Sequence, residues 1–191
     1  PYVDGTICSY DAIINSKGDV LFESGNVTPV SIMDIVNNKA DAYFYIEKQL
    51  PDDVRDAGRR CVKAFDVKSR FIHFEFFRLT KDQEGLGKKG SIVALEVNMR
   101  PCGGFTPDMM NFAHSLDVYK IWADMITFDK TEVRSKGHAY CAFAGRRDGK
   151  HFVYDDAQIR EKYRFNLKMD QRLPKALAEA MGDQMYVALF K

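Results

Sequence analysis

Two stretches of alternating aromatic, branched and polar residues, 71–79 and 92–97, constrain the fold of this chain most strongly. Runs of this kind are typical of β-strands, and the polar, glycine-rich stretch 81–90 between them predicts a long loop. The two strands are therefore expected to form a hairpin. Because side chains alternate between the two faces of a strand, each strand should have one largely apolar face and one face that also carries polar groups.

The alternation assigns particular side chains to each face. The first strand should carry on its polar face Phe71, His73, Glu75, Phe77 and Leu79, and on its other face Ile72, Phe74, Phe76 and Arg78. The second should carry on its polar face Ala94, Glu96, Asn98 and Arg100, and on its apolar face Val93, Leu95, Val97 and Met99. If the two apolar faces are buried together, Glu75, Glu96 and Asn98 emerge on the same side of the sheet.

These polar groups are typical of a metal site. Two carboxylates and an amide oxygen are hard ligands, which suit Mg²⁺. Phenylalanines flank Glu75, and an unpaired charge among them is costly. A bound cation would compensate that charge, a buried arginine partner is a second possibility, and a solvent-facing carboxylate is a third. Arg100 follows at a spacing suited to anionic oxygens, and the adjacent Gly103 and Gly104 let the backbone approach a ligand closely.

The remaining patterns predict an α+β protein with a mostly antiparallel sheet and flanking helices. Further strands are expected at 6–14, 20–23, 43–47, 139–144 and 185–190. Helices are expected at 31–37, 51–67, 107–115, 117–126, 156–163 and 171–181. The charged, weakly patterned stretch 129–136 is the best candidate boundary. It divides the chain into a domain of residues 1–127 and an appended α/β lobe of residues 128–191. No motif indicates the role of this lobe.

The polar strand pair resembles the signature of the ATP-grasp superfamily. Residues 73–77 and 95–101 match a pattern in which a glutamate on one strand and Glu-x-Asn-x-Arg on the next hold Mg²⁺ ions against the nucleotide phosphates. The glycine-rich loop 103–105 and the helix after it resemble the branch of carbamoyl-phosphate synthase large chains and carboxylate–amine ligases. The resemblance covers residues 1–127 and implies the C-terminal subdomain of such an enzyme.

The resemblance also implies roles for individual residues. Glu96 would bridge both Mg²⁺ (or Mn²⁺) ions, Glu75 would hold one ion and Asn98 the other. Arg100 would be the catalytic residue that stabilises the transferred phosphoryl group or the acyl phosphate. Phe77 could pack against the adenine of ATP, although core packing is the simpler interpretation. Tyr2 and Val3 resemble the segment that leads from the adenine hinge of the family into its first strand.

In this family the nucleotide lies between two halves, and the other half supplies a flexible glycine-rich loop and phosphate-binding lysines. No such segment precedes Pro1. We therefore expect this chain to be part of a ligase that needs its N-terminal half, and to be inactive alone. The implied partners are ATP, a small carboxylate and an amine or other nucleophile, with a homo-oligomer as a further expectation.

Composition excludes several other classes. Lysine and arginine number 28 against 27 aspartates and glutamates, so no general attraction to nucleic acid or to an anionic membrane is expected. No stretch approaches the roughly 20 apolar residues of a membrane span. The four cysteines are scattered without a Cys-x-x-Cys pair, which suggests neither a zinc site nor a disulfide framework. A cytoplasmic protein with reduced thiols is the expectation.

Three residues near the strand pair have two interpretations each. His73 shares a face with Glu75 and could touch substrate or phosphate, but a structural histidine is the simpler interpretation. Asp11 could form the floor of the site, or it could be a surface carboxylate. Cys102 lies in the loop 101–105, which the resemblance implies as a substrate loop. We interpret it as a small loop residue, because the sequence shows no basic partner for a nucleophile.

Two other functions compete with the ligase. One is a non-catalytic domain that binds a nucleotide or a metal, or neither. The other is an unrelated metal-dependent hydrolase that uses Glu75 and Glu96, although such a site usually recruits a further aspartate or histidine.

Overall fold

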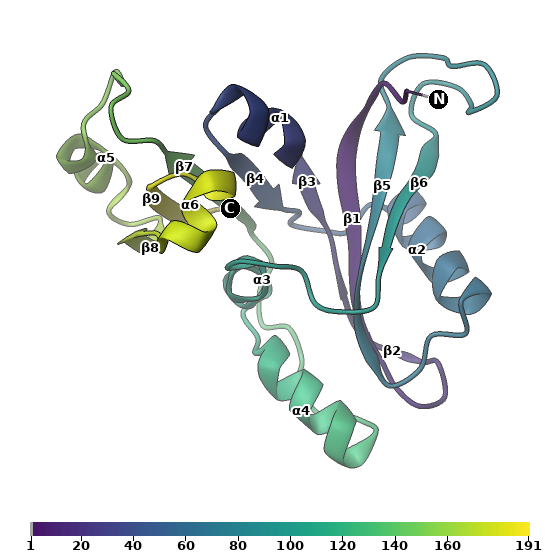
Figure 1. The fold of residues 1–191 in the computed structure, drawn as a ribbon. Coiled ribbons are helices and arrows are strands. Elements are labelled where there is room, and N and C mark those ends of the chain that lie inside the picture. The colour runs from purple at the N-terminus through teal and green to yellow at the C-terminus, as the bar shows by residue number, and fades with distance from the viewer. Residues whose placement is uncertain (1) are drawn as a thin grey trace.

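A computed structural model describes residues 2–191, except for the side chains of residues 32–34. Within this part of the chain a single 9-stranded sheet has the order β6-β5-β1-β3-β4-β7-β9-β8, and β2 pairs with β1 beside this path. Every one of these strand pairings is antiparallel. The expected α+β class with a mostly antiparallel sheet and flanking helices is therefore confirmed (Figure 1).

The strands and helices have the following bounds. The strands are β1 Gly5–Ile14, β2 Val20–Ser24, β3 Asn26–Thr28, β4 Tyr43–Ile46, β5 Arg70–Leu79, β6 Ile92–Asn98, β7 Tyr140–Arg146, β8 Leu167–Arg172 and β9 Gln184–Phe190. The helices are α1 Ile32–Asn38, α2 Asp52–Ala64, α3 Thr106–His114, α4 Val118–Phe128, α5 Asp156–Tyr163 and α6 Lys175–Met181.

One face of the β1–β5 region is covered by α2. Helix α2 buries Val54, Ala57, Gly58 and Val62 against the sheet, where they join a core that includes Tyr10 and Phe74. A Cβ atom at Gly58 would lie 2.1 Å from the Tyr10 ring, so only glycine permits this close approach. The two acidic residues in the first turn of α2 suit the positive end of its dipole.

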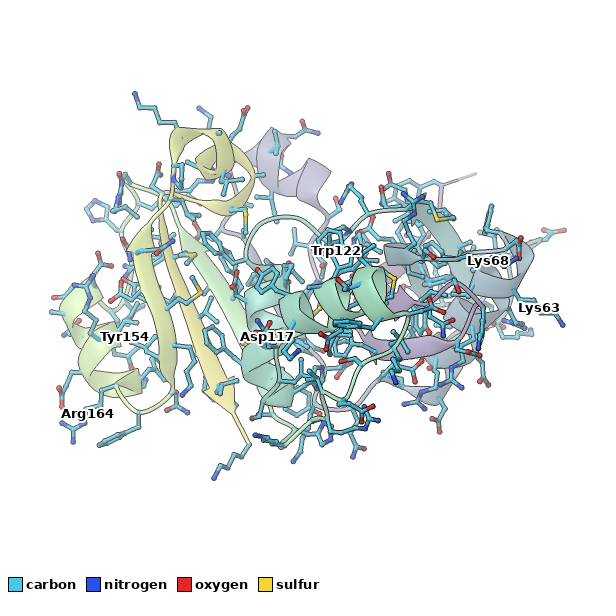
Figure 2. All side chains as sticks on the ribbon, turned by 90° about the horizontal axis from the view of Figure 1, so that it is seen from below. Lys63, Lys68, Asp117, Trp122, Tyr154 and Arg164 are labelled. Carbon is cyan, nitrogen blue, oxygen red and sulfur yellow. The ribbon has the colours of Figure 1, made fainter. Side chains whose placement is uncertain are left out.

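The opposite face of the same strands is covered by α3 and α4. Phe71 of β5 is buried there with Ile13, Met109 and Ile121, and its ring meets Trp122 of α4 edge to face at 5.7 Å. Figure 2 labels Trp122 on α4, between the β7–β9 end of the molecule and the end that carries Lys63 and Lys68. His73 and Glu75 lie further along this face of β5, so the core fixes the strand that carries them.

The structure corrects the expected elements in two regions. Residues 167–172 form β8, whereas the sequence pattern predicted a helix from 171, and α6 begins only at Lys175. Strand β8 was missed because it lies at the end of the sheet, where four of its six side chains are exposed and charged or polar. Strand β3 was missed because it has only 3 residues.

The sheet continues without a break from β4 into β7 across the predicted domain boundary, through four paired positions. The division of the chain at residue 127 stays a prediction. The strands predicted at 6–14, 20–23, 71–79 and 92–97 correspond to β1, β2, β5 and β6.

Candidate functional site

A pocket of about 290 Å³ lies where β5 and β6 meet the loop before α3. It brings together the predicted metal ligands, the predicted catalytic arginine and the predicted substrate-loop residues: Glu75, Glu96, Asn98, Arg100, His73, Gly103 and Gly104. Its other walls come from β3, β4, the start of α3 and the end of α6, and they are formed by Asn26, Thr28, Ala42, Phe44, Cys102, Thr106, Ala180 and Met181.

Strand register places the acidic and amide groups on one face. Glu75 pairs with Glu96, and His73 pairs with Asn98, across the β5–β6 ladder. Directly paired residues of an antiparallel ladder point to the same side. The ladder shifts register between Glu75 and Phe76, so that Phe76 pairs with Ala94 and Leu95 is the extra residue of a bulge. The face expected to carry both Ala94 and Glu96 is therefore interrupted at Leu95.

The bulge lies on β6, the edge strand of the described sheet, and the apolar side chains of β6 around it are exposed. Leu95, Val97 and Met99 are 43%, 37% and 37% exposed. Their expected burial against the apolar face of β5 is therefore not observed. The reason is that α2 packs over β1 and β5, whereas only the beginning of β6, at Ile92, joins that core.

His73 is held by a buried carboxylate. Its Nδ1 lies 2.7 Å from Oδ1 of Asp11, and Asp11 is fully buried and also accepts a hydrogen bond from the Ser9 hydroxyl. Burial by itself lowers the pKa of His73, but the negative charge of Asp11 and hydrogen bonds to Asp11, Cys102 and Glu75 outweigh it and raise this pKa above its ordinary value. Asp11 therefore orients the imidazole through Nδ1, and the raised pKa favours its protonated, cationic form.

Glu75 is the pocket carboxylate that contacts His73. Its Oε1 lies 3.4 Å from Nε2 of His73. The hydrogen bond with His73 lowers the pKa of Glu75 most, burial opposes this, and the charge of His73, a hydrogen bond with Glu96 and the charge of Arg100 lower it further. Two acidic side chains facing each other across a ladder are unfavourable unless positive charge offsets them.

The pocket also holds a polar group without a partner. The amide nitrogen of Asn98 is buried and makes no hydrogen bond among the residues that the structure describes. Leaving such a group unsatisfied costs about 1–3 kcal/mol, so a ligand in the pocket is a natural partner for the Asn98 amide. The oxygen and nitrogen of this side chain exchange places when the amide rotates, and either atom can face the ligand.

The loop between β6 and α3 forms the rim of the pocket. The guanidinium of Arg100 is exposed and donates from Nη1 to the carbonyl oxygen of Pro101 at 2.9 Å, which leaves its other N–H groups for an anion. Gly104 has a φ of 61°, a left-handed conformation that favours glycine, and a Cβ atom there would lie 3.0 Å from Cε of Met181. The second glycine therefore serves the turn and the close contact with α6.

Three predicted nucleotide-binding residues do not line this pocket. Tyr2 is 88% exposed, Val3 is half-buried before β1, and Phe77 lies on β5 in register with Ile7 and Val93. Their roles in adenine binding stay predictions.

No motif pointed to Cys102 or to α6 as walls of the pocket, or to Asp11 behind His73. Asp11 and Cys102 had been assigned the simpler interpretations, yet Asp11 orients His73 and the Cys102 sulfur lies 3.7 Å from Nε2 of His73. The basic partner that Cys102 lacked in the sequence is thus supplied from β5. Met181 and Ala180 come from α6, far along the chain. The alternation of Ser9 and Asp11 on one face of β1 was the only local signal.

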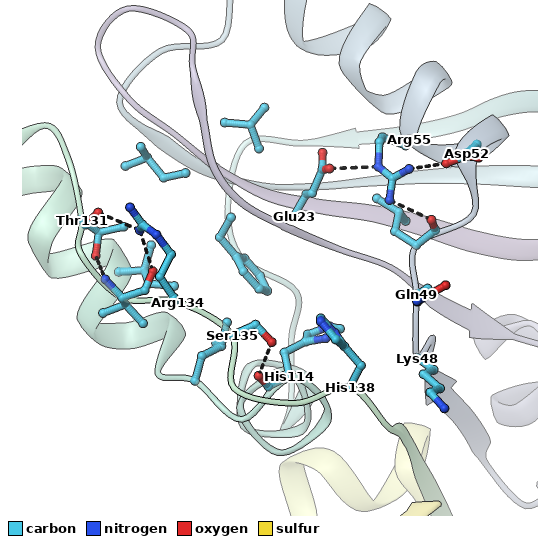
Figure 3. A pocket seen from close by; sticks show the side chains of 17 residues that line it. Glu23, Lys48, Gln49, Asp52, Arg55, His114, Thr131, Arg134, Ser135 and His138 are labelled. Carbon is cyan, nitrogen blue, oxygen red and sulfur yellow. Dashed lines mark hydrogen bonds and ion pairs between the residues drawn. The ribbon is translucent and has the colours of Figure 1, made fainter. Parts of the chain in front are cut away.

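A larger hollow of about 790 Å³ lies elsewhere, between β2, the start of α2, α4 and residues 131–138 (Figure 3). Its arginines already have partners: Arg55 pairs with Glu23 and Asp52, and Arg134 donates to the carbonyl oxygens of Thr131 and Val133. None of the residues expected to bind metal lines it. The smaller pocket is therefore the better candidate site, because it brings Glu75, Glu96, Asn98 and Arg100 together.

His114 lies in the wall of the larger hollow, and its lowered pKa should make the stability of the fold depend on pH. Burial first, and then the nearby His138, lowers the pKa of His114 to about 4. The unfolded chain, with a histidine pKa near 6.5, then binds more protons than the folded chain as the pH falls, so stability declines. Because of this group, the free energy of unfolding should fall by about 2 kcal/mol between about pH 7 and about pH 5. Urea unfolding at the two pH values measures this loss.

The control for this prediction is a pair of variants. His114→Gln should remove the loss, whereas His151→Gln, at an exposed position, should keep it. His73 acts in the opposite direction, because a raised pKa in the folded state loses stability as the pH rises, and comparison between variants cancels its effect. Equal pH dependence in His114→Gln and the unmodified protein would contradict the assignment.

No protein-family model and no curated protein sequence matches this chain. Solved structures do match. An L-amino acid ligase from Bacillus licheniformis has a TM-score of 0.67 and 13% identity, with coverage of 99% of this chain and 47% of that chain. A protein of Archaeoglobus fulgidus assigned to the ATP-grasp superfamily has a TM-score of 0.53 and 12% identity, with coverage of 100% and 46%.

A third match is the biotin carboxylase domain of Hydrogenobacter thermophilus 2-oxoglutarate carboxylase, solved with MgADP and bicarbonate. It has a TM-score of 0.58 and 10% identity, with coverage of 98% of this chain and 42% of that chain. These identities are low, so the likeness concerns the fold. The chain has the fold found in ATP-grasp proteins, as the sequence resemblance predicted, and it spans about half the length of these structures. No helix in the described residues is long and apolar enough to cross a membrane.

Proposed function

We propose that this chain is the C-terminal, metal- and phosphate-binding half of a Mg-ATP-dependent ligase. The enzyme would activate a carboxylate as an acyl phosphate, which an amine or another nucleophile then attacks. One observation supports this most: Glu75, Glu96, Asn98 and Arg100 line one pocket in a chain with the fold of ATP-grasp proteins. Fold alone does not assign function, so the proposal depends on these side chains.

The donor set fits magnesium. Glu75 and Glu96 face each other across the ladder. The side-chain amide of Asn98 offers an oxygen to an ion, and its buried, unpaired nitrogen can donate to an oxygen of a ligand. Oxygen donors of this kind are the ligands that Mg²⁺ takes, together with water and phosphate. Glu75, Glu96 and Asn98 would therefore hold Mg²⁺, or Mn²⁺, with Glu96 shared between two ions. When bound, the metal would offset negative charge on the nucleotide phosphates.

The other pocket groups have roles that follow from their chemistry. Arg100, at the rim, has N–H donors without a partner among residues 2–191, and these suit a phosphoryl oxygen or the substrate carboxylate. His73, oriented by Asp11, adds positive charge next to Glu75. The loop through Gly103 and Gly104 lets a substrate approach the backbone, and α3 begins at the pocket with Thr106, at the end of the helix that favours anions.

The remaining parts of the proposal concern the whole protein. The matched structures are about twice as long, so we place the lysines and the flexible loop that neutralise the phosphates in an N-terminal half, and we expect this half alone to be inactive. Tyr2 and Val3 would lie next to the adenine, with Phe77 nearby. One matched structure holds MgADP and another is an L-amino acid ligase, which supports the nucleotide and the reaction class. A cytoplasmic homo-oligomer is proposed for the complete enzyme.

The test is release of ADP by the protein in its natural length. It would be incubated with Mg-ATP and pools of amino acids and other small carboxylates, with and without amines. We expect release that depends on magnesium and rises when the correct carboxylate is present. Absence of both carboxylate-dependent ADP release and magnesium-dependent ATP binding in a folded protein would overturn the proposal.

A further inference from the structure

The candidate pocket extends across the sheet, and its two ends differ in chemistry. The predicted metal ligands come from β5 and β6, whereas β3 and β4 follow on the other side of β1 in the strand order. At the β4 end the pocket has an apolar lining, formed by Ala42, Phe44, Ala180 and Met181. None of the described residues that β3, β4, α3 and α6 contribute to the lining is charged. This apolar end of the pocket therefore suits an uncharged, apolar group.

The apolar end is held in shape by the structure around it. Phe44 is paired with Phe143 of β7 in the sheet, and the two rings stack with centroids 4.8 Å apart. Helix α6 is fixed by Arg147, which follows β7 and donates to the carbonyl oxygens of Ala178 and Glu179 at 3.2 Å and 2.6 Å. A side chain that enters this end therefore meets a surface of defined size, which is what selection between substrates requires.

Two buried polar side chains beside the apolar end have hydrogen-bonding groups left over. Asn26 is 5% exposed. Its Oδ1 accepts from the Thr28 hydroxyl at 3.3 Å, but its side-chain nitrogen has no partner in the described part of the chain. Thr106, the first residue of α3, is 2% exposed, and its hydroxyl makes no hydrogen bond to any described residue. Both residues line the pocket, so an oxygen atom of a ligand is a natural partner for these donors.

We propose that the apolar end selects the carboxylate substrate, which is a small carboxylic acid with a compact apolar side chain, about the size of leucine or methionine. This inference rests on the proposed function, which places the reacting carboxylate near Arg100 and the metal ligands. The apolar side chain lies against Phe44 and Met181, and Asn26 and Thr106 donate to a substrate oxygen. A charged side chain finds no counter-ion at this end, and burying it unpaired is costly.

The size of the pocket limits the substrate in the same direction. Its volume is about 290 Å³, at the lower limit of the roughly 300–1,000 Å³ typical of small-molecule sites. A bulky aromatic acid or a long peptide therefore does not fit. In a pocket of fixed shape, one methylene group too many or too few changes recognition by about 10-fold or more.

The test is calorimetric titration of the natural-length protein, with and without magnesium and a non-hydrolysable ATP analogue. The apolar probes are L-leucine, L-methionine and isocaproate, and the charged probes are L-glutamate and L-lysine. At least one apolar acid is expected to bind at least about 10-fold more tightly than either charged acid. Failure of all three apolar acids to bind, or equally tight binding of a charged acid, would overturn the proposal.

Variants locate the binding at the apolar end. Ala180→Leu fills this end and should weaken binding of the preferred acid at least about 10-fold. Ala176→Leu, at an exposed position of the same helix outside the pocket, is the matched control and should bind normally. Thr106→Val removes only a hydroxyl without a protein partner, so it should weaken binding by about 3–10-fold and leave the urea midpoint of unfolding unchanged. Normal affinity in both Ala180→Leu and Thr106→Val would contradict the assignment.

The same titrations separate this inference from the ligase proposal. Tight binding of an apolar acid without magnesium-dependent ADP release would refute the ligase and keep the selection at the apolar end. ADP release that only the charged acids stimulate would support the ligase and refute this selection.

Discussion

Glu96→Gln is expected to reduce carboxylate-dependent ADP release by at least about 100-fold, since loss even of a group that only supports a metal ligand costs about 10–100-fold. Glu96 is exposed on β6 and faces Glu75 across the ladder. The change keeps the shape of the side chain and removes the charge that the proposed role of bridging two metal ions needs. Because no core contact is lost, the variant should fold normally, and the measurement is steady-state release of ADP at several Mg²⁺ concentrations.

The matched control is Glu84→Gln. Glu84 is an exposed glutamate of the loop between β5 and β6 and does not line the pocket. This variant should keep full activity and full magnesium dependence. If Glu96→Gln retained normal turnover while folded, Glu96 would not be a metal ligand.

Phe71→Ala is expected to destabilise the fold by about 3–5 kcal/mol, the usual cost of removing a fully buried phenylalanine. Phe71 is 1% exposed and lies between β5 and α4, where its ring meets Trp122 at 5.7 Å. The truncation opens a cavity under the helices that cover the pocket face of the sheet. Urea unfolding, followed by the fluorescence of Trp122, the single tryptophan of the chain, measures the loss directly.

Phe65→Ala serves as the control for this prediction. Phe65 follows α2 and is 54% exposed, so its loss should change stability by only about 0.5 kcal/mol. Equal destabilisation by the two changes would contradict the assignment of the core between β5 and α4.

The strand pair that carries the candidate site was predictable because its signal is local. Residues 70–79 and 92–98 combine strand-forming composition with alternation, and a hairpin brings sequence neighbours together. The alternation of side chains therefore places Glu75, Glu96 and Asn98 on one face of the hairpin, and in the structure all three line one pocket. The bulge at Leu95 could not be predicted, since a bulge residue has the same strand-forming character as its neighbours and leaves no mark in the sequence pattern.

The rest of the site depends on contacts between distant parts of the chain. Asp11 meets His73 only because β1 lies beside β5 in the sheet, and α6 reaches the pocket only because β7 and β9 extend that sheet. Strand order of this kind is set by packing, which a single sequence does not reveal. For the same reason Cys102 had no visible partner. The end of β8, with charged and polar side chains at the edge of the sheet, was assigned to a helix that begins at residue 171.

The most direct test of the proposed carboxylate activation follows the oxygen atoms. The natural-length protein would be given Mg-ATP, the nucleophile and a carboxylate substrate labelled with a heavy oxygen isotope, and the released phosphate would be analysed by mass spectrometry. If the carboxylate attacks the terminal phosphorus, and the nucleophile then displaces phosphate from the acyl group, one labelled oxygen appears in the phosphate of each turnover. Product formation with unlabelled phosphate, or with release of AMP and pyrophosphate, would contradict the account.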